Sequence, residues 1–374
     1  MVDEGACIMA GLYQYTTSKG TFWRVNYTKP DGTPTTRRGF TTKRDAKLFA
    51  AENDVSQARG EWVDPTDGKK TVRHYAELYK QARLANLKPS SRNVMETTWR
   101  IHVEPHWGNR QVSTIKKSQV AAWVGTKNTE RSPQTVRRMV FVLSGILELA
   151  VDDRAIVRNP TVGVQLPAKI KKPARYLTHQ QVELLAKQLK EDEKSTIVRF
   201  LAYTGLRWGE LAALRVQDVD LVKNRVTVEQ NAVLVSGVYE IGTPKTGKSR
   251  TLGSAPFLAF LLRPLMKDKP PEAYVFGDGQ TVMRYPNAGD GWFVGAVKRA
   301  RKSDKTFPEI TLHDLRHTAA SLAVSAGANV KAVQRMLGHA SAAMTLDVYA
   351  DLFDEDMDAV ATELGNARSV ALGA

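Results

Sequence analysis

The sequence has 374 residues, which is too long for one ordinary domain, so two or three domains are expected. Hydrophobic residues make up 42%, which excludes a disordered tail, and no apolar run approaches the ~20 residues of a membrane-spanning helix. The formal net charge of +15 favours a polyanionic partner, first of all nucleic acid, although a merely soluble basic protein has the same composition.

At the N-terminus no basic segment precedes an apolar one, so we do not expect secretion. Cys7 is the only cysteine, so the sequence offers neither an internal disulfide nor a thiolate cluster for zinc, as expected in a reducing cytosol. Met9 opens the segment MAGLYQY, so we expect translation to begin at either Met1 or Met9.

The first expected domain, residues 1–65, combines three strands with one helix. Side chains alternate between apolar and polar, as is typical of strands, in residues 12–16, 21–27 and 35–40. Thr41 or Thr42 can cap a helix that continues to about Arg59, and a polar linker begins at Pro65. Residues 11–50 hold eight Lys and Arg against two Asp and Glu, which suits a surface for DNA.

The second expected domain, residues 71–165, is helical. Apolar residues recur at helical spacing in four segments: Val72–Leu87, Val94–Val103, Val120–Val124 and Val136–Val151. Pro89, Pro105 and Pro133 are expected to separate these helices. Residues 71–172 carry 18 basic against seven acidic residues, which indicates a second surface for phosphate.

The third expected domain, residues 175–374, mixes helices with a few short strands. Thr178 can cap a helix over 179–190, strand-like runs lie within 225–253, and helices resume from Pro256. Residues 347–363 carry seven acidic residues and no basic one, so this tail is not expected to lie on phosphate. Its apolar residues instead form a stripe that could pack on a neighbouring subunit or on its own domain: Met357, Val360 and Leu364. The fold class is therefore mainly α with minor β, in three domains.

Four short segments of the third domain combine cations, imidazoles and a tyrosine: residues 204–211 (TGLRWGEL), 244–248 (PKTGK), 313–317 (HDLRH) and 337–339 (LGH), the last followed by Tyr349. Cutting a phosphodiester without a metal requires a nucleophile, cations for the phosphate oxygens and an acid for the leaving oxygen. Arginine can bind phosphate through two N–H groups, lysine can deliver a proton, and tyrosine can form a covalent phosphoester.

Each of these residues also has an ordinary explanation when it is taken alone. Arg207 is expected at the start of a helix, where a positive charge is electrostatically unfavourable. A role in binding a ligand and a role as a surface residue are therefore equally good explanations for it. The others are commonest as surface or packing residues: Glu210 as a helix carboxylate, Lys245 as a solvated turn residue, His313 and Arg316 as a surface pair, His339 as the neighbour of a helix stop and Tyr349 as a packed ring.

Zinc is a further alternative, since His313 and His317 stand four residues apart and could share one ion. The HExxH pattern is absent and no cysteine lies nearby, so we expect no metal and no cofactor.

Taken together and in order, six residues resemble the catalytic signature of the tyrosine recombinases: Arg207, Lys245, His313, Arg316, His339 and Tyr349. The segments TGLRWGEL, HDLRHTAAS and LGHASAAMTLDVYA resemble that family's motifs nearly residue for residue. The resemblance is strong over residues 175–355 and weaker over 71–165 and 11–60. The whole sequence is similar to integrases from phages of actinobacteria, which begin with an arm-type DNA-binding domain.

The resemblance implies a role for each residue. Arg207 and Arg316 would clamp the scissile phosphate, and His313 and His339 would hydrogen-bond it, with His313 also a candidate for proton transfer. Glu210 would support the site. Lys245, with Lys248 as a rival, would protonate the 5′ leaving oxygen, and Tyr349 would form a 3′-phosphotyrosine.

The resemblance also implies partners and a place of action. These are double-stranded DNA attachment sites, a homotetramer on DNA, a host DNA-bending factor and a phage directionality factor, in the cytoplasm of a bacterial host at its nucleoid. A type IB-like topoisomerase and a non-catalytic DNA-binding regulator remain as alternatives. The intact set of six residues disfavours the regulator.

Overall fold

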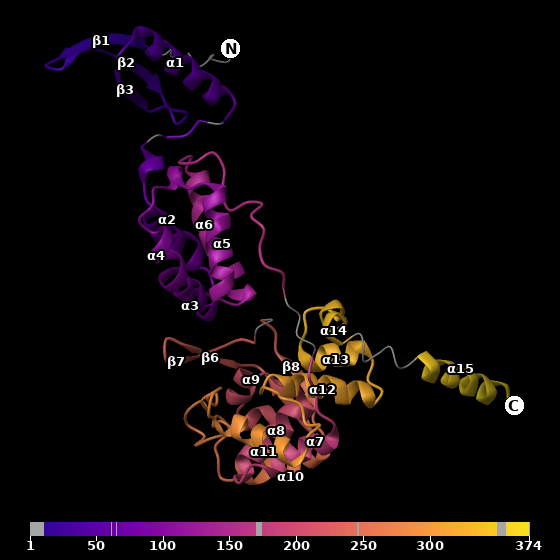
Figure 1. Ribbon diagram of the computed structural model, residues 1–374. Coiled ribbons are helices and arrows are strands. Elements are labelled where there is room, and N and C mark those ends of the chain that lie inside the picture. The colour runs from indigo at the N-terminus through magenta and orange to yellow at the C-terminus, as the bar shows by residue number, and fades with distance from the viewer. Residues whose placement is uncertain are drawn as a thin grey trace, which may run out of the picture. The chain divides into compact units, whose positions relative to one another are not determined.

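The computed structural model describes residues 11–60, 62–64, 66–169, 174–244, 247–349 and 357–373, with the backbone alone at 357–360 and 363. The chain divides into two compact units, Met1–Ile170 and Lys171–Ala374, and each is considered by itself. The expected fold class, mainly α with minor β, is confirmed (Figure 1). None of the described helices is both long enough and apolar enough to cross a membrane.

The first unit begins with an antiparallel sheet in the order β1-β2-β3. Its strands, and the helix that packs on them, are β1 (Gly11–Thr17), β2 (Gly20–Thr28), β3 (Pro34–Phe40) and α1 (Lys43–Ala58). Thr42 caps α1 by accepting a hydrogen bond from the Asp45 N–H, which settles the choice between Thr41 and Thr42. Between sheet and helix lies a small apolar cluster: Val25, Tyr27, Ala46, Ala50 and Trp62.

The segment after α1 is held to neighbouring parts of the first unit by an ion pair and a hydrogen bond. Lys29, in the turn before β3, forms an ion pair with the Asp64 carboxylate, and the Asp64 N–H donates to the Arg154 carbonyl at 2.9 Å. The residue directly before the expected polar linker is therefore bonded to segments on both sides of that linker within the first unit.

The rest of the first unit is a helical bundle with its own apolar cluster. Its helices are α2 (Val72–Tyr79), α3 (Pro89–Thr98), α4 (Glu104–Trp107), α5 (Lys117–Glu130) and α6 (Pro133–Asp152), with π-helical turns at Lys80–Leu84 and Trp99–Val103 and 3₁₀ turns at Asp67–Lys69 and Val112–Thr114. Pro89 and Pro133 each open a helix, where proline costs no hydrogen bond.

The expectation that Pro105 separates two helices is wrong. The chain continues from α3 through the π-helical turn directly into α4. The Glu104 N–H donates to the Trp99 carbonyl, five residues back, so the turn that precedes Pro105 is wider than an α-helical one. The wider turn accommodates a residue that has no N–H and whose ring clashes in a regular helix.

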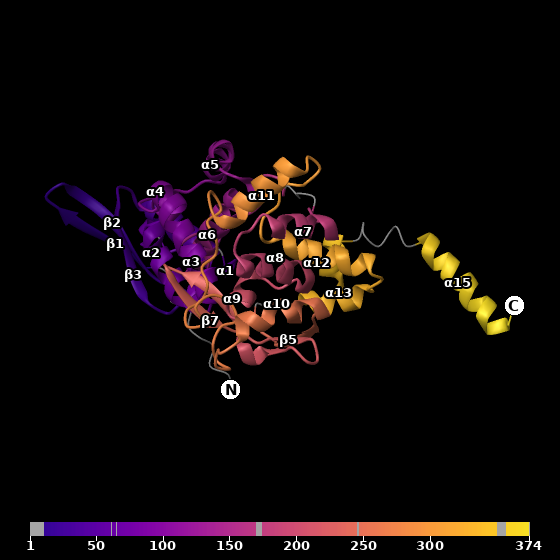
Figure 2. The same cartoon turned by 90° about the horizontal axis from the view of Figure 1, so that it is seen from below.

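The second unit surrounds α8 with other helices. It contains α7 (His179–Lys187), α8 (Asp192–Thr204), α9 (Trp208–Ala212), α10 (Pro256–Met266), α11 (Trp292–Ser303), α12 (Asp314–Ser325), α13 (Val330–Leu337), α14 (Ala342–Tyr349) and α15 (Met357–Leu372), with a 3₁₀ turn at Val216–Asp218. Helices α7, α10 and α12 all contact α8 (Figure 2), which buries Ile197, Phe200 and Leu201.

Five short strands complete the second unit. They are β4 (Val219–Asp220), β5 (Arg225–Val228), β6 (Asn231–Val235), β7 (Val238–Gly242) and β8 (Arg250–Gly253). Strands β4, β5 and β8 form one sheet in that order, and β6 pairs with β7 in a hairpin. Thr178 caps α7 as expected, but α7 ends at Lys187 rather than at residue 190.

Candidate active site

Arg207 stands at the point where α8 has ended and α9 begins. Gly205 stops α8 in a left-handed conformation (φ 67°), and an added Cβ there would come within 2.7 Å of Leu337. Arg207 is the N-cap of α9, and its N–H donates to Glu210 Oε2 at 2.9 Å. Its guanidinium also donates to Glu210 Oε1 at 2.9 Å, so one carboxylate holds both ends of the arginine.

Arg250 is a member of this network that the sequence interpretation missed. Its two terminal nitrogens donate to the Glu210 carboxylate at 3.0 and 2.7 Å, and its Nε donates to the Met336 carbonyl at 3.2 Å. Burial raises the pKa of Glu210, but the hydrogen bond and charge of Arg250, with the help of Arg207, outweigh it and keep the pKa below its ordinary value. One buried carboxylate therefore ties β8 to the start of α9.

Arg316 is buried in α12 and is held by the ends of two other helices. Nη1 donates to the Gly205 carbonyl at 2.6 Å, and Nη2 donates to the Leu337 carbonyl. Helix C-termini carry partial negative charge, which stabilises a buried cation. Burial and the charge of Arg207 lower the pKa of Arg316 to about 9, so it stays protonated at neutral pH. These bonds use two of the five N–H donors of a guanidinium.

Tyr349 ends α14 with its side chain 2% exposed. Its hydroxyl lies 2.7 Å from Nδ1 of His317, in α12. Burial raises the pKa of Tyr349 to about 12, although the charge of Arg316 acts in the opposite direction. His313, one turn before His317, is exposed, and the two imidazole rings are 5.4 Å apart.

His339 is placed by the end of α13. Gly338 adopts a left-handed conformation (φ 64°), and the next residue points Nδ1 toward the Thr345 hydroxyl at 2.9 Å. Burial, followed by the charges of Arg316, Arg207 and Arg250, lowers the pKa of His339 to about 4. The imidazole is therefore neutral at pH 7. The positive potential around it favours the binding of an anion.

The structure thus brings together Glu210 and four of the six candidate residues: Arg207, Arg316, His339 and Tyr349. His313 lies beside them and is exposed. Lys245 lies outside the described residues, and its rival Lys248 is exposed.

Two residues that the sequence did not assign to the site, Arg250 and His317, belong to the same group. The alternation of side chains along β8 could have predicted the position of Arg250, because it lies on the same inward face of the strand as Leu252. His317 was considered only as a zinc ligand, and the described residues contain no cluster of three or more potential ligands.

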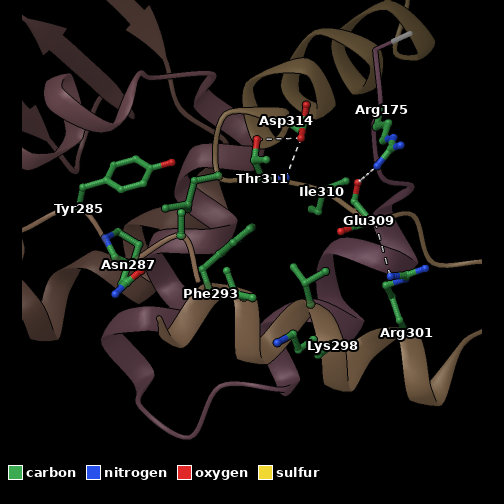
Figure 3. A pocket seen from close by; sticks show the side chains of 15 residues that line it. Arg175, Tyr285, Asn287, Phe293, Lys298, Arg301, Glu309, Ile310, Thr311 and Asp314 are labelled. Atoms are coloured by element: carbon green, nitrogen blue, oxygen red, sulfur yellow. Dashed lines mark hydrogen bonds and ion pairs between the residues drawn. The ribbon is translucent and has the colours of Figure 1, made fainter. Parts of the chain in front are cut away.

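A separate pocket of about 630 Å³ lies beside the start of α12. Asp314 lines it and accepts hydrogen bonds from the Thr311 N–H and hydroxyl at 2.6 and 2.8 Å (Figure 3). On its other side, Glu309 contacts Arg175 and Arg301. The Thr311–Asp314 bonds fix the first turn of α12, which carries His313 and Arg316.

Comparison with known proteins gives a family and several relatives. Residues 175–356 match the model of the phage integrase family. An integrase of Mycobacterium phage D29 is 26% identical, with 83% of this chain and 84% of the relative covered. A transposase from transposon Tn916 of Enterococcus faecalis is 28% identical, with 92% and 90% covered.

Solved structures give the same result. The Tn1549 transposon integrase, in complex with a circular intermediate DNA, is 25% identical with a TM-score of 0.63, over 77% of this chain and 99% of that one. A lambda integrase tetramer bound to a Holliday junction is 15% identical with a TM-score of 0.57, over 88% and 95%. The second likeness concerns the fold alone.

Proposed function

The chain belongs to the phage integrase family, and from that premise we propose which residues carry out each step of cutting and rejoining DNA. It is a tyrosine site-specific recombinase that integrates and excises phage DNA through a covalent 3′-phosphotyrosine, and its partner is double-stranded DNA. The phosphotyrosine conserves the energy of the cleaved bond, so the chemistry requires neither ATP nor a metal.

Tyr349 is the proposed nucleophile, and the observation that carries this assignment is the charge around its hydroxyl. Two guanidiniums, those of Arg207 and Arg250, share the Glu210 carboxylate. A third, that of Arg316, donates only to backbone carbonyls, and its charge acts on the Tyr349 hydroxyl. The excess of positive charge beside a tyrosine hydroxyl matches a site for a phosphate that the tyrosine attacks.

The remaining roles follow from reach and chemistry. Arg207 and Arg316 bind the non-bridging oxygens of the scissile phosphate, because each keeps N–H donors beyond those used within the protein. His313 and His339 add hydrogen bonds to the same phosphate. Lys245 is proposed to protonate the 5′ leaving oxygen, on the strength of its Pro-Lys-Thr context in the sequence.

Two parts of the chain are proposed to bind different DNA sites. Residues 1–65 form an arm-binding module, and residues 71–165 act with the catalytic domain, 175–374, as a clamp around the crossover site. Basic excess in both parts supports this division, because phosphate contacts supply much of the affinity for DNA. Footprinting of fragments 1–65 and 70–374 on attachment-site DNA tests it, and protection of the same sequence by both fragments would refute it.

The proposed assembly is a homotetramer on two duplexes in the cytoplasm of a bacterial host, at the nucleoid, aided by a host DNA-bending factor and a phage directionality factor. Helix α15 supports contacts between subunits, because Leu364 of the expected stripe is exposed, as are Val370 and Leu372. The side chains of Met357 and Val360 lie outside those described.

One experiment separates this function from its alternatives. Incubation with attachment-site DNA followed by denaturation should leave a covalent adduct, which a non-catalytic regulator cannot form. Recombination between two distinct sites then excludes a relaxing topoisomerase of type IB. Absence of both products would refute the proposed function.

A further inference from the structure

The hydroxyl of Tyr349 already has a defined partner. His317 places Nδ1 2.7 Å from it, and the two rings meet at 61° with their centres 5.6 Å apart. His317 follows Arg316 directly in α12, so one turn of helix presents both a cation for phosphate and an imidazole for the tyrosine. Among the described residues, no hydrogen bond joins His313 or His339 to this hydroxyl.

A phenol needs a proton acceptor before it can attack phosphorus efficiently. With a pKa of about 12, roughly one Tyr349 hydroxyl in 10⁵ is ionised at pH 7. His317 is half-buried, and burial, followed by the opposing charges of Asp314 and Arg316, lowers its pKa below the ordinary value. The imidazole is therefore neutral at pH 7, and with its proton on Nε2 it can accept one at Nδ1.

The charged groups around His317 are compatible with this direction of transfer. Arg316 and Asp314 flank it in α12, His313 lies one turn earlier, and His339 approaches from the segment after α13. A bound phosphate would add negative charge to this group and offset the arginines. The imidazole would then become more basic when the DNA is in place, which is when a proton acceptor is required.

We infer that His317 is the catalytic base that activates Tyr349, an inference that rests on the proposed role of Tyr349 as the nucleophile. The phenol proton passes to Nδ1 of His317 while an oxygen lone pair of Tyr349 forms the new bond to phosphorus. The bond from phosphorus to the 5′ oxygen breaks, and its electron pair stays on that oxygen, which takes a proton from the general acid. In rejoining, the 5′ hydroxyl gives its proton back to the deprotonated general acid as it attacks phosphorus. The bond from phosphorus to the tyrosine oxygen breaks, and the imidazolium returns its proton to that oxygen.

The second unit contains a matched control for this pair. His179 Nδ1 lies 2.7 Å from the Tyr203 hydroxyl, the same contact at the same distance, between α7 and α8. His179→Asn and His317→Asn therefore remove the same kind of bond. Asparagine keeps a polar atom near the position of Nδ1, but it cannot hold a transferred proton.

The test is single-turnover formation of the covalent adduct between pH 6 and 9, on DNA whose scissile 5′ oxygen is replaced by sulfur. A thiolate leaves without a general acid, so the rate reports on activation of the nucleophile. Wild type and His179→Asn should share a rate that is nearly level above pH 7. His317→Asn should be roughly 10²–10⁴-fold slower at pH 7. Its rate should rise about tenfold per pH unit, because hydroxide must then remove the proton.

A contrary result has a clear form. If His317→Asn matches wild type, or if it is slower by the same factor at every pH, His317 acts only through packing and the inference fails. DNA affinity measured on the same preparation confirms that the variant is folded, and imidazole in the buffer should restore His317→Ala. If wild-type protein itself forms no adduct, the proposed function fails instead, so the two failures are distinguishable.

Discussion

Two histidine–tyrosine pairs in the second unit share one contact and differ in their surroundings. The distance from Nδ1 to the hydroxyl is 2.7 Å both in His179–Tyr203 and in His317–Tyr349. Beside the first pair, Arg199 donates three hydrogen bonds to Glu183, so the two charges balance. Beside the second, Arg207 and Arg250 share the Glu210 carboxylate, and Arg316 donates only to backbone carbonyls. The proposed active site is therefore distinguished from the other pair by its excess of positive charge, because the hydrogen bond is the same in both.

The largest expected effect comes from removing one oxygen from each tyrosine in turn. Tyr349→Phe should abolish the covalent adduct, because phenylalanine has no atom to attack phosphorus, and Tyr203→Phe should retain it. Both should bind DNA as wild type does, since affinity rests on many phosphate contacts. Native and denaturing gels measure binding and adduct. An adduct formed by Tyr349→Phe would transfer the assignment to another tyrosine.

The next effect concerns the arginine beside each pair. Arg207→Lys should slow adduct formation by roughly 10²–10³-fold, because one ammonium does not reproduce two directed N–H donors on phosphate. Arg199→Lys should leave the rate unchanged, since its partner is Glu183 rather than DNA. Single-turnover rates at saturating DNA test the contrast, and equal losses in the two variants would break it.

A smaller effect is expected on stability, where neutralising Glu210 should cost more than neutralising Glu183. Glu210 is fully buried between Arg207 and Arg250, and Glu210→Gln leaves those cations without a counter-charge. We expect a loss of about 3 kcal/mol in the free energy of unfolding. Glu183 is partly exposed, so Glu183→Gln should cost less than about 1 kcal/mol. Urea unfolding at pH 7 compares them, and a cost for Glu210→Gln as small as that for Glu183→Gln would contradict the network.

The smallest effect is a dependence of stability on pH. The pKa of His339 is about 4 in the folded protein, against an ordinary value of about 6.5. Between these values the unfolded chain binds a proton that the folded chain does not, so the free energy of unfolding falls as pH drops from 6.5 to 4. His339→Gln should make this decline shallower. Thermal unfolding at pH 7, 6 and 5 measures it, and identical slopes would show that folding does not lower the pKa of His339.

Local patterns in the sequence predicted the elements but not all of the contacts between them. Thr178 and Gly338 act as a helix cap and a helix stop because these effects depend on a few neighbouring residues. Pro105 was misjudged because a π-helical turn, which no local pattern announced, accommodates it. Arg250 is 40 residues from Glu210, and His317 is 32 from Tyr349, so only the packing of α9, β8, α12 and α14 brings these pairs together.

The most direct test of the central claim is to identify the atom that holds the DNA. The wild-type protein is trapped on a substrate that cannot be rejoined, digested with protease and nuclease, and the modified peptide is sequenced by mass spectrometry. The account predicts a single nucleotide joined through its 3′-phosphate to Tyr349. A nucleotide on Tyr203, on any other residue, or joined through a 5′-phosphate would contradict it.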